Sequence, residues 1–390
     1  METQAGIYIH IPFCERKCTY CNFNTTDFAG DLAERYVNAV AREIAFRGEN
    51  VGRASTPARA PVDTIYFGGG TPSIVEAGQL ARLIEACRDN FDVAADAEIT
   101  IEINPATLSG QKLGAWRAAG INRASVGVQS FIDRELAALS RTHTAEDARH
   151  TVEALARAGF DNISIDLIAG LPEQTLADWE FNLDEALRLR PSHLSLYLLE
   201  IKEGTQLYAQ LKRAERPRPD DDLAAEMYRM ICTATRGAGY EHYEISNFAM
   251  KDDAAPGRFW SKHNMKYWIG APFYGMGCGA HSYDGRARWV NLLRTEKYIE
   301  SVIEKGHATG ERMELTDEGR ASEALFMGLR LIDGIRLDEF RREYGVDVAR
   351  RYGDELARLE ETGLVEIDGN RLRLTARGLL LSNEVFVCFV

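Results

Sequence analysis

Six short apolar or β-branched runs alternate with amphipathic stretches over the first two hundred residues. The stretches have apolar residues at helical spacing, as in residues 32–47 and 145–159. Repeated strand–helix units with right-handed crossovers build a parallel sheet, either closed as a barrel or open and doubly wound. Because six strands are found and a complete barrel has eight, we predict a partial (β/α)6 TIM-like barrel. The six runs are GIYIHI (6–11), DTIYFGG (63–69), EITIEIN (98–104), NRASVGVQ (122–129), NISIDLIAG (162–170) and HLSLYLLE (193–200).

The remainder of the chain is expected to form two further regions. The barrel domain is expected to span residues 1–205. Residues 206–312 are less regular and form a linking region, and residues 313–390 form a C-terminal α+β domain. In this end, helices lead into a two-strand ribbon with a turn at residues 368–370, which is typical of a winged helix. It contains more Asp and Glu than Lys and Arg, so we interpret it as a packing or lid domain that does not bind DNA.

Charge and cysteine usage narrow the class of protein. The net charge of −13 provides no basic field for nucleic acid or anionic lipid. The N-terminal residues lack the features of a signal peptide, and no apolar run is long enough to span a bilayer. Seven cysteines form a poor disulfide framework and a reasonable cytosolic metal framework. We therefore expect a cytoplasmic protein without a transmembrane segment, a description compatible with transient docking at a membrane.

Three cysteines, Cys14, Cys18 and Cys21, follow the first strand on one short loop. Three thiolates can hold three corners of a [4Fe–4S] cluster and leave the fourth iron open to a ligand. A zinc site completed by a distant histidine, or three unrelated core cysteines, would fit the spacing too. The polar residues Lys17 and Thr19 between the cysteines favour a loop over a buried strand.

Polar and glycine residues stand where the later strands end, the edge at which both βα architectures place their sites. The backbone of residues 68–71 is free of side-chain bulk and can meet a ligand, although a glycine triplet alone usually marks only a turn. Glu102 and Asp166 can accept hydrogen bonds from ribose hydroxyls, and Arg141 offers a planar fork for a carboxylate. A surface carboxylate, a helix cap or a solvated charge would explain the same residues.

The C-x-x-x-C-x-x-C spacing directly after the first strand resembles the radical S-adenosylmethionine (SAM) superfamily. Four further segments, YFGGGTPS (66–73), EINP (102–105), SVGVQSF (125–131) and DLIAGLPEQT (166–175), look like the subfamily around anaerobic coproporphyrinogen III dehydrogenase. The resemblance implies that the open iron binds the amino and carboxylate groups of SAM. It also implies a set of SAM-binding residues: Tyr8, Tyr20, Gly69, Gly70, Thr71, Glu102, Gln129, Arg141 and Asp166.

The segment HNMKYW (263–268) matches the H-N-x-x-Y-W motif of the haem-chaperone family HemW. The resemblance implies that His263 is an axial ligand of haem iron and that Tyr267 and Trp268 pack on the porphyrin face. Cys278 and His281 are lower-ranked candidates for a second ligand. Without this resemblance, a lone histidine would be interpreted as structural.

The resemblance implies a haem chaperone that transfers haem to apo-haem proteins such as respiratory enzymes, as a monomer or a homodimer. Whether SAM is cleaved in radical catalysis stays open. An oxygen-independent coproporphyrinogen III dehydrogenase is one alternative, although such an enzyme has a fourth cysteine where this chain has Phe23 and a longer N-terminal arm. A radical SAM methyltransferase, including a haem-degrading one, and a binding module with a structural metal and no haem are the others.

Overall fold

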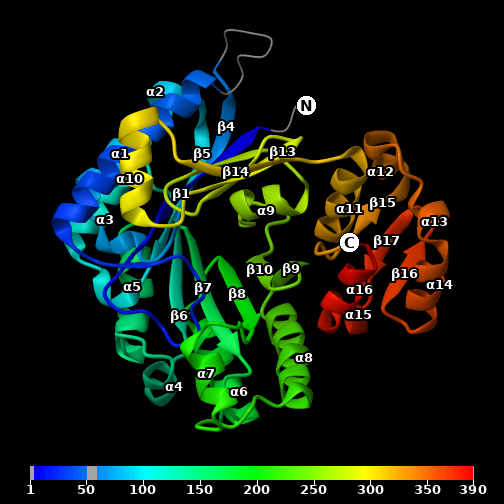
Figure 1. The fold of residues 1–390 in the computed structure, drawn as a ribbon. Coiled ribbons are helices and arrows are strands. Elements are labelled where there is room, and N and C mark those ends of the chain that lie inside the picture. Colours follow the sequence, from blue (N-terminus) through cyan, green and yellow to red (C-terminus); the bar gives the residue numbers. More distant parts are fainter. Residues whose placement is uncertain (1–3, 51–58, 390) are drawn as a thin grey trace.

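The molecule is organised around a run of parallel strands. The computed structural model describes residues 4–50 and 59–389, and Figure 1 shows its fold. Each strand of the run pairs with the next in chain order, while the first and last pair on their other sides with strands from later in the chain, so the barrel stays open. The partial (β/α)6 barrel expected from the sequence is thereby confirmed. The strands are β1 (Ala5–Ile11), β4 (Pro61–Gly69), β5 (Asp92–Ile103), β6 (Arg123–Gln129), β7 (Asn162–Ala169) and β8 (His193–Leu198).

Helices cover the outer face of these strands (Figure 1). Two of them begin with a capping box, in which Thr144 or Thr175 accepts a hydrogen bond from the third helical N–H and donates its own N–H to that residue's carboxylate. The pattern fixes where each helix starts after its strand. The helices are α1 (Gly30–Asn50), α2 (Ala77–Asn90), α3 (Gly110–Ala119), the short α4 (Asp133–Ala138), α5 (Ala145–Arg157) and α6 (Leu176–Arg188).

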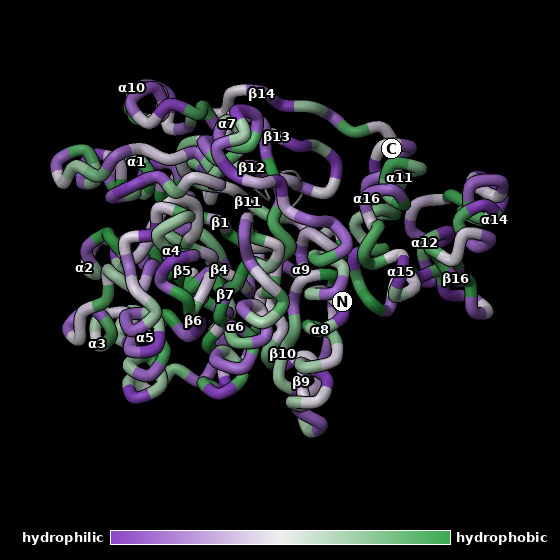
Figure 2. The backbone as a smooth tube through the Cα atoms, turned by 90° about the horizontal axis from the view of Figure 1, so that it is seen from below, coloured by the Kyte–Doolittle hydropathy of each residue, from purple (hydrophilic) through white to green (hydrophobic). Residues whose placement is uncertain are grey.

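Side chains alternate in character along the strands, as β5 illustrates. Ile99, Ile101 and Ile103 are buried in the hydrophobic core. Thr100 and Glu102 lie between them in the sequence and therefore face the opposite side, the interior of the open barrel. Figure 2 shows hydrophobic segments of the central strands inside a ring of helices. The apolar core thus lies between strands and helices, and polar groups are left to line the interior.

Residues 206–312 extend this sheet at both edges. At the β8 edge lie β10 (Asn247–Met250) and β9 (Tyr240–Glu244); at the β1 edge lie β11 (Phe273–Met276), β12 (His281–Tyr283), β13 (Ala287–Asn291) and β14 (Thr309–Glu314). β11 is parallel to β1, whereas the outer strands are antiparallel to their neighbours. Helices in this region are α7 (Gln206–Lys212), α8 (Asp221–Gly237), α9 (Lys262–Trp268) and α10 (Thr295–Lys305). The boundaries at residues 205 and 312 stay a prediction.

The C-terminal region has a hydrophobic core of its own, which includes Leu325, Phe340, Leu356, Leu372 and Val385. Its three strands form a small sheet in the order β15-β17-β16, and the expected ribbon is present, with Gly369 in the left-handed conformation that its turn requires. The helices and ribbon agree with the winged-helix-like end. The elements are α11 (Asp317–Gly328), β15 (Ile335–Arg336), α12 (Leu337–Tyr344), α13 (Val348–Arg351), α14 (Gly353–Glu361), β16 (Val365–Asp368), β17 (Arg371–Leu374), α15 (Ala376–Leu380) and α16 (Ser382–Phe386).

Among the described residues, no helix combines the length and the hydropathy that are needed to cross a membrane.

Candidate cofactor and ligand site

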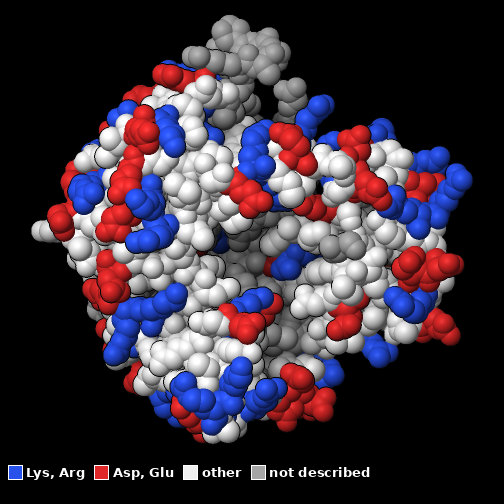
Figure 3. All heavy atoms as spheres, viewed as in Figure 1, with Lys and Arg blue, Asp and Glu red and all other residues white. Residues whose placement is uncertain are grey.

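A cavity of about 640 Å³ opens at the carboxyl ends of the parallel strands. Its wall is formed by the cysteine loop, the ends of β4 to β8, the turn between β9 and β10, and α15 of the C-terminal region. Figure 3 shows the hollow between the sheet and the C-terminal region, with charged side chains inside it. Its size falls in the range of small-molecule and cofactor sites.

The cysteine loop is fastened at its base and open to the cavity. Two short strands, β2 (Phe13–Cys14) and β3 (Thr26–Asp27), pair with each other on either side of it. Cys14 at the end of β2, and Cys18 and Cys21 between the two strands, are part-exposed free thiols that line the cavity. The predicted loop is thus present, and all three cysteines face one space.

The surroundings of the cysteines favour a cationic partner. Burial raises the pKa of the Cys14 and Cys21 thiols, so their thiolates need a compensating positive charge. Arg141 provides part of it, because its Nη1 donates to Cys18 Sγ at 3.5 Å. No three His, Cys, Asp or Glu side chains in the described part of the chain converge to hold a single metal ion. A [4Fe–4S] cluster requires cysteines that are farther apart than the ligands of a single ion, since each cysteine ligates its own iron. The donor set therefore fits such a cluster.

A second polypeptide segment supports the cysteine loop from behind. The Asn24 side chain donates to the carbonyl oxygens of Leu293 at 2.8 Å and of Cys278 at 3.3 Å, and the backbone carbonyl oxygen of Asn24 lies 2.8 Å from His10 Nε2. Cys278 is fully buried, and the Tyr36 hydroxyl donates to its Sγ at 3.6 Å. Cys278 thus occupies a packing position behind the loop. His281 is exposed on β12 and lies outside the cavity lining.

Most of the predicted SAM-binding residues meet at the cavity, among them Tyr20, Gly69, Thr71, Gln129 and Arg141. Gly70 joins them, and there a side chain has no room, because a Cβ would lie 2.7 Å from the backbone of Pro12 and Phe13. Tyr8 is the exception. Its hydroxyl lies 3.1 Å from His10 Nδ1 and its ring packs on Tyr66 deeper in the barrel, away from the lining.

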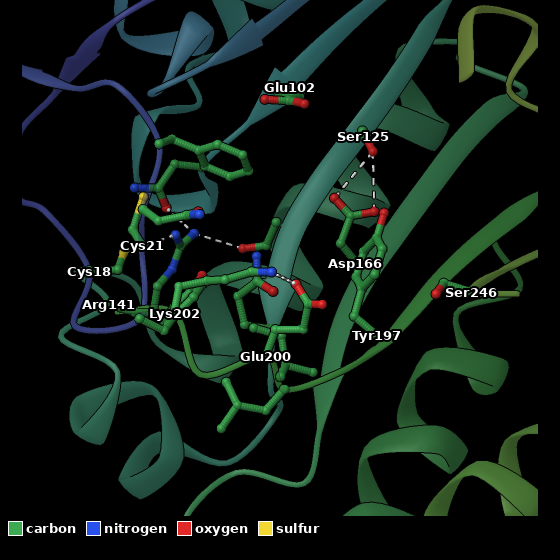
Figure 4. A pocket seen from close by; sticks show the side chains of 18 of the residues that line it. Cys18, Cys21, Glu102, Ser125, Arg141, Asp166, Tyr197, Glu200, Lys202 and Ser246 are labelled. Atoms are coloured by element: carbon green, nitrogen blue, oxygen red, sulfur yellow. Dashed lines mark hydrogen bonds and ion pairs between the residues drawn. The ribbon is translucent and has the colours of Figure 1, made fainter. Parts of the chain in front are cut away.

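The two expected carboxylates, Glu102 and Asp166, project into the same space (Figure 4). Glu102 accepts hydrogen bonds from the Tyr66 hydroxyl at 2.9 Å and the Gly69 N–H at 3.1 Å. Desolvation by burial outweighs these bonds and raises the pKa of Glu102 to about 7. Asp166 accepts from the Ser125 hydroxyl at 3.2 Å, and burial raises its pKa as well. Glu102 can therefore accept or donate hydrogen bonds near neutral pH.

The predicted haem ligand lies outside the cavity lining. His263 is 1% exposed, at the opposite end of the barrel interior. Its Nδ1 lies 2.8 Å from Thr64 Oγ1 and its Nε2 2.9 Å from the Tyr267 hydroxyl. Burial lowers the pKa of His263 to about 3, so the imidazole is neutral. Binding iron through either nitrogen requires release of one of these hydrogen bonds, and the assignment stays a prediction.

Helix α9, which carries the motif, closes the end of the barrel interior opposite the cavity, here called the barrel floor. Glu98 on β5 accepts hydrogen bonds from the N–H groups of Lys262 and His263, each at 3.1 Å, and so caps the helix. A second cavity, of about 130 Å³, is lined by Tyr267 and Trp268 among others. It is far smaller than the usual 300–1,000 Å³ of a ligand pocket. In this conformation, neither aromatic residue faces a space the size of a porphyrin.

Several residues of the cavity wall were not predicted from the sequence. They come from the turn between β9 and β10, from α8 and from the C-terminal region, and only the tertiary fold brings them beside the strand ends. No local motif marks them, apart from the YEISN stretch that contains two of them. They include Tyr228, Ile245, Ser246, Arg330, Leu379, Leu380, Ser382 and Asn383.

Comparison with known proteins agrees with this arrangement. The radical SAM superfamily matches residues 8–186, and the HemN C-terminal domain matches residues 315–381. Heme chaperone HemW of Bacillus subtilis is 35% identical over 384 residues, which cover 98% of this chain and 98% of that protein. The chain belongs to the HemW family of radical SAM proteins. A second HemW-family relative, Heme chaperone HemW of Mycobacterium tuberculosis, is 34% identical and covers 97% of this chain and 93% of its own length.

The chain is also similar to a mitochondrial protein and to a solved structure. The mitochondrial radical S-adenosyl methionine domain-containing protein 1 of Bos taurus is 35% identical, over 98% of this chain and 87% of that protein. The structure of coproporphyrinogen III oxidase HemN from Escherichia coli, a radical SAM enzyme, superposes with a TM-score of 0.85. That pair is 27% identical and covers 100% of this chain and 90% of HemN. The barrel and the C-terminal region of the HemW-family chain thus share the architecture of the oxidase.

Proposed function

We propose that this chain is a haem chaperone, which binds haem and transfers it to apo-haem proteins such as respiratory enzymes. The observation that carries the proposal is the similarity to Heme chaperone HemW along 98% of both chains. Because the match is continuous, it includes the cysteine loop, the strand ends and the C-terminal wall of the cavity. The partners are then haem and a recipient apo-protein.

The residues of the inner cavity fit the cofactors of the radical SAM superfamily. Cys14, Cys18 and Cys21 would hold three irons of a [4Fe–4S] cluster, and the fourth iron would bind SAM. When bound, this pair supplies one-electron reductive chemistry or, in a chaperone, a structural signal. Residues 69–71, Gln129 and Arg141 would surround SAM.

The protein side chains have clear tasks in such a site. Arg141 is held by the Gly127 carbonyl at 2.7 Å and by Asn104 Oδ1 at 3.2 Å, so its position beside the cysteine loop is fixed before a ligand arrives. Glu102 and Asp166 present oxygen atoms for hydroxyl groups of a ligand. The loop between β2 and β3 forms one side of the cavity.

Two haem positions are consistent with the proposal. The part of the cavity lined by Ile245, Leu379 and Leu380 offers apolar surface to a flat ligand without any rearrangement. Coordination by His263, with Tyr267 and Trp268 on the porphyrin, requires α9 to leave the barrel floor. We propose the cavity as the resting position. His263 is then a ligand only in a second conformation.

The proposed compartment is the cytoplasm, because a cluster site needs reduced thiols. The oligomeric state is a monomer or a homodimer. Docking at a membrane would come through a recipient protein.

A second candidate function, oxygen-independent coproporphyrinogen III dehydrogenase, is favoured by the TM-score of 0.85 to HemN. Phe23 argues against it. This side chain lines the cavity and is 62% exposed at the position where the enzyme family has a fourth cysteine. A phenyl ring cannot do the chemistry of a thiol.

The experiment that tests the proposal is an anaerobic haem titration of the full chain with its cluster reconstituted. We expect a saturable, near-equimolar shift of the Soret band, followed by transfer of the haem to an added apo-haem protein. Absence of saturable binding contradicts the chaperone. Conversion of coproporphyrinogen III to protoporphyrinogen with SAM and a reductant would establish the second candidate.

A further inference from the structure

The main cavity has two chemically different ends. One end holds the cysteines and Arg141, while mainly aliphatic and aromatic side chains line the other. Figure 4 shows Cys18, Cys21 and Arg141 on one side of the cavity, and Tyr197 and Ser246 on the other. An apolar ligand therefore fits the second end. The apolar and aromatic residues there are Tyr197, Tyr228, Ile245 and Leu380.

Arg330 is the cation that lines this apolar end. It follows α11, and its backbone carbonyl accepts from the Ile245 N–H at 3.2 Å, which fastens it to the turn between β9 and β10. Its guanidinium lies over the Trp268 ring, 4.2 Å from the ring centroid, and its Nη2 lies 3.3 Å from Glu244 Oε2. The side chain is 26% exposed, so part of it reaches the cavity.

The contacts of Arg330 leave some of its N–H donors free to bind a ligand. A guanidinium has five N–H donors, and Glu244 engages Nη2 alone, at 3.3 Å. Glu244 also accepts from the Ser246 N–H at 2.9 Å and from the Asn247 amide, so its charge is shared. The Arg330 Nε is buried without a hydrogen-bond partner. The guanidinium is thus held in place and incompletely satisfied.

The other cations of the lining are committed elsewhere or stand at the cysteine loop. Arg141 donates to Gly127, Asn104 and Cys18. Lys202 pairs with Glu200 at 2.8 Å, and Lys17 is exposed on the cysteine loop, where it donates to the Phe23 carbonyl. Arg330 is therefore the cation best placed beside the apolar wall.

We propose that Arg330 binds a carboxylate of the haem carried by this protein, while the porphyrin plane packs on the apolar end of the cavity. The proposal rests on the proposed function. A planar guanidinium matches a carboxylate through paired hydrogen bonds, and partial desolvation strengthens them. Trp268 is then a positioning residue. Its ring orients the guanidinium, and this contact gives the tryptophan of the H-N-x-x-Y-W motif a task away from the porphyrin face.

The test compares haem with haem dimethyl ester, which has the same ring and no free carboxylates. Both are titrated anaerobically into the cluster-reconstituted full chain and into Arg330→Gln and Arg330→Lys. We expect Arg330→Gln to weaken haem binding by about tenfold and to leave the affinity for the ester unchanged. Arg330→Lys keeps the positive charge but lacks the planar guanidinium. Its affinity for haem should therefore lie between those of the wild type and of Arg330→Gln.

Arg288→Gln is the matched control. Arg288 also joins the sheet to α11, since it pairs with Glu323 at 2.7 Å and lies 4.8 Å from the centroid of the Tyr283 ring, but it stands outside the main cavity. We expect this variant to bind both ligands like the wild type. Equal weakening of haem and ester in Arg330→Gln would mean a structural role and would overturn the proposal.

The wild type alone gives a second measurement that does not depend on the folding of a variant. We expect it to bind haem about tenfold more tightly than the dimethyl ester. Equal affinities for haem and ester overturn the carboxylate contact and leave the chaperone function standing. Absence of saturable haem binding removes the proposed function itself, so the two failures are distinguishable.

Discussion

His263 and Tyr267, the first and fifth residues of the H-N-x-x-Y-W motif, bind each other across one turn of α9, with 2.9 Å between Nε2 and the hydroxyl. Thr64 on β4 holds the other ring nitrogen at 2.8 Å. Both ring nitrogens of His263 are therefore satisfied, and these contacts tie α9 to the barrel floor. A structural contribution must be measured before any loss of haem binding in a His263 variant is assigned to coordination.

Replacement of His263 by alanine is expected to destabilise the haem-free protein. The change removes two buried hydrogen bonds and leaves a void, which together cost about 2–4 kcal/mol of unfolding free energy. Denaturant unfolding without haem measures it. Thr64→Val, which removes the hydroxyl and keeps the shape, should cost less, about 1 kcal/mol. An alanine variant as stable as the wild type, with an altered Soret band, would instead indicate an iron ligand.

Glu102 should make the protein less stable as the pH rises from about 4.5 to 7. Its pKa is about 7 in the folded protein, above its ordinary value of 4.5, so the folded state holds a proton that the unfolded state has lost. The stabilisation is complete below pH 4.5 and is lost as the pH rises through 7, by up to about 3 kcal/mol. Glu102→Gln should flatten this part of the stability profile. Parallel profiles for wild type and variant would contradict the assignment.

A side chain at Gly70 should disturb the cysteine loop. The Cβ of Gly70→Ala would lie 2.7 Å from the backbone of Pro12 and Phe13, which lead into Cys14. Because backbone atoms cannot move aside like a flexible side chain, we expect fewer irons per chain after reconstitution. Gly78→Ala on α2 is the control, since its Cβ meets nothing within 4 Å. Equal iron content in both variants would show that the loop tolerates the displacement.

Iron content should depend on three cysteines and be indifferent to the rest. Replacing Cys14, Cys18 or Cys21 by serine removes one of the proposed thiolate ligands, and we expect most of the iron and the brown colour to be lost. Cys232, a half-buried cysteine on α8, provides the matched control. Unchanged iron in the Cys18→Ser variant would exclude the cluster assignment.

The parallel strands were predictable because their pattern is local. Runs such as EITIEIN alternate between core-facing isoleucines and interior-facing polar residues, and each is separated from the next by an amphipathic helix. The parallel arrangement brings the strand ends to one edge, so Glu102 and Asp166 could be placed in a common site from the sequence. The added strands β9 to β14 were harder to predict, because each has only three to six residues.

The wall of the cavity farthest from the cysteine loop and the position of His263 could not be predicted from the sequence, because both depend on tertiary structure. Arg330 and Leu380 reach the cavity only because the C-terminal region packs beside the turn between β9 and β10, a contact without a local signature. His263 was predicted from the resemblance of its motif, which does not reveal burial. Its enclosure follows from the capping of α9 by Glu98, which lies 165 residues earlier in the chain.

The contact between Asn24 and the Leu293 carbonyl also sets an order for assembly of the protein. During synthesis the cysteine loop leaves the ribosome early, whereas the segment that supports it is made about 270 residues later. Strand β11, which covers the free edge of β1, arrives nearly as late. The loop therefore lacks this support until Leu293 has been made, and stable insertion of a cluster is expected to follow that point in translation. Until then the three cysteines are an open loop of oxidisable thiols.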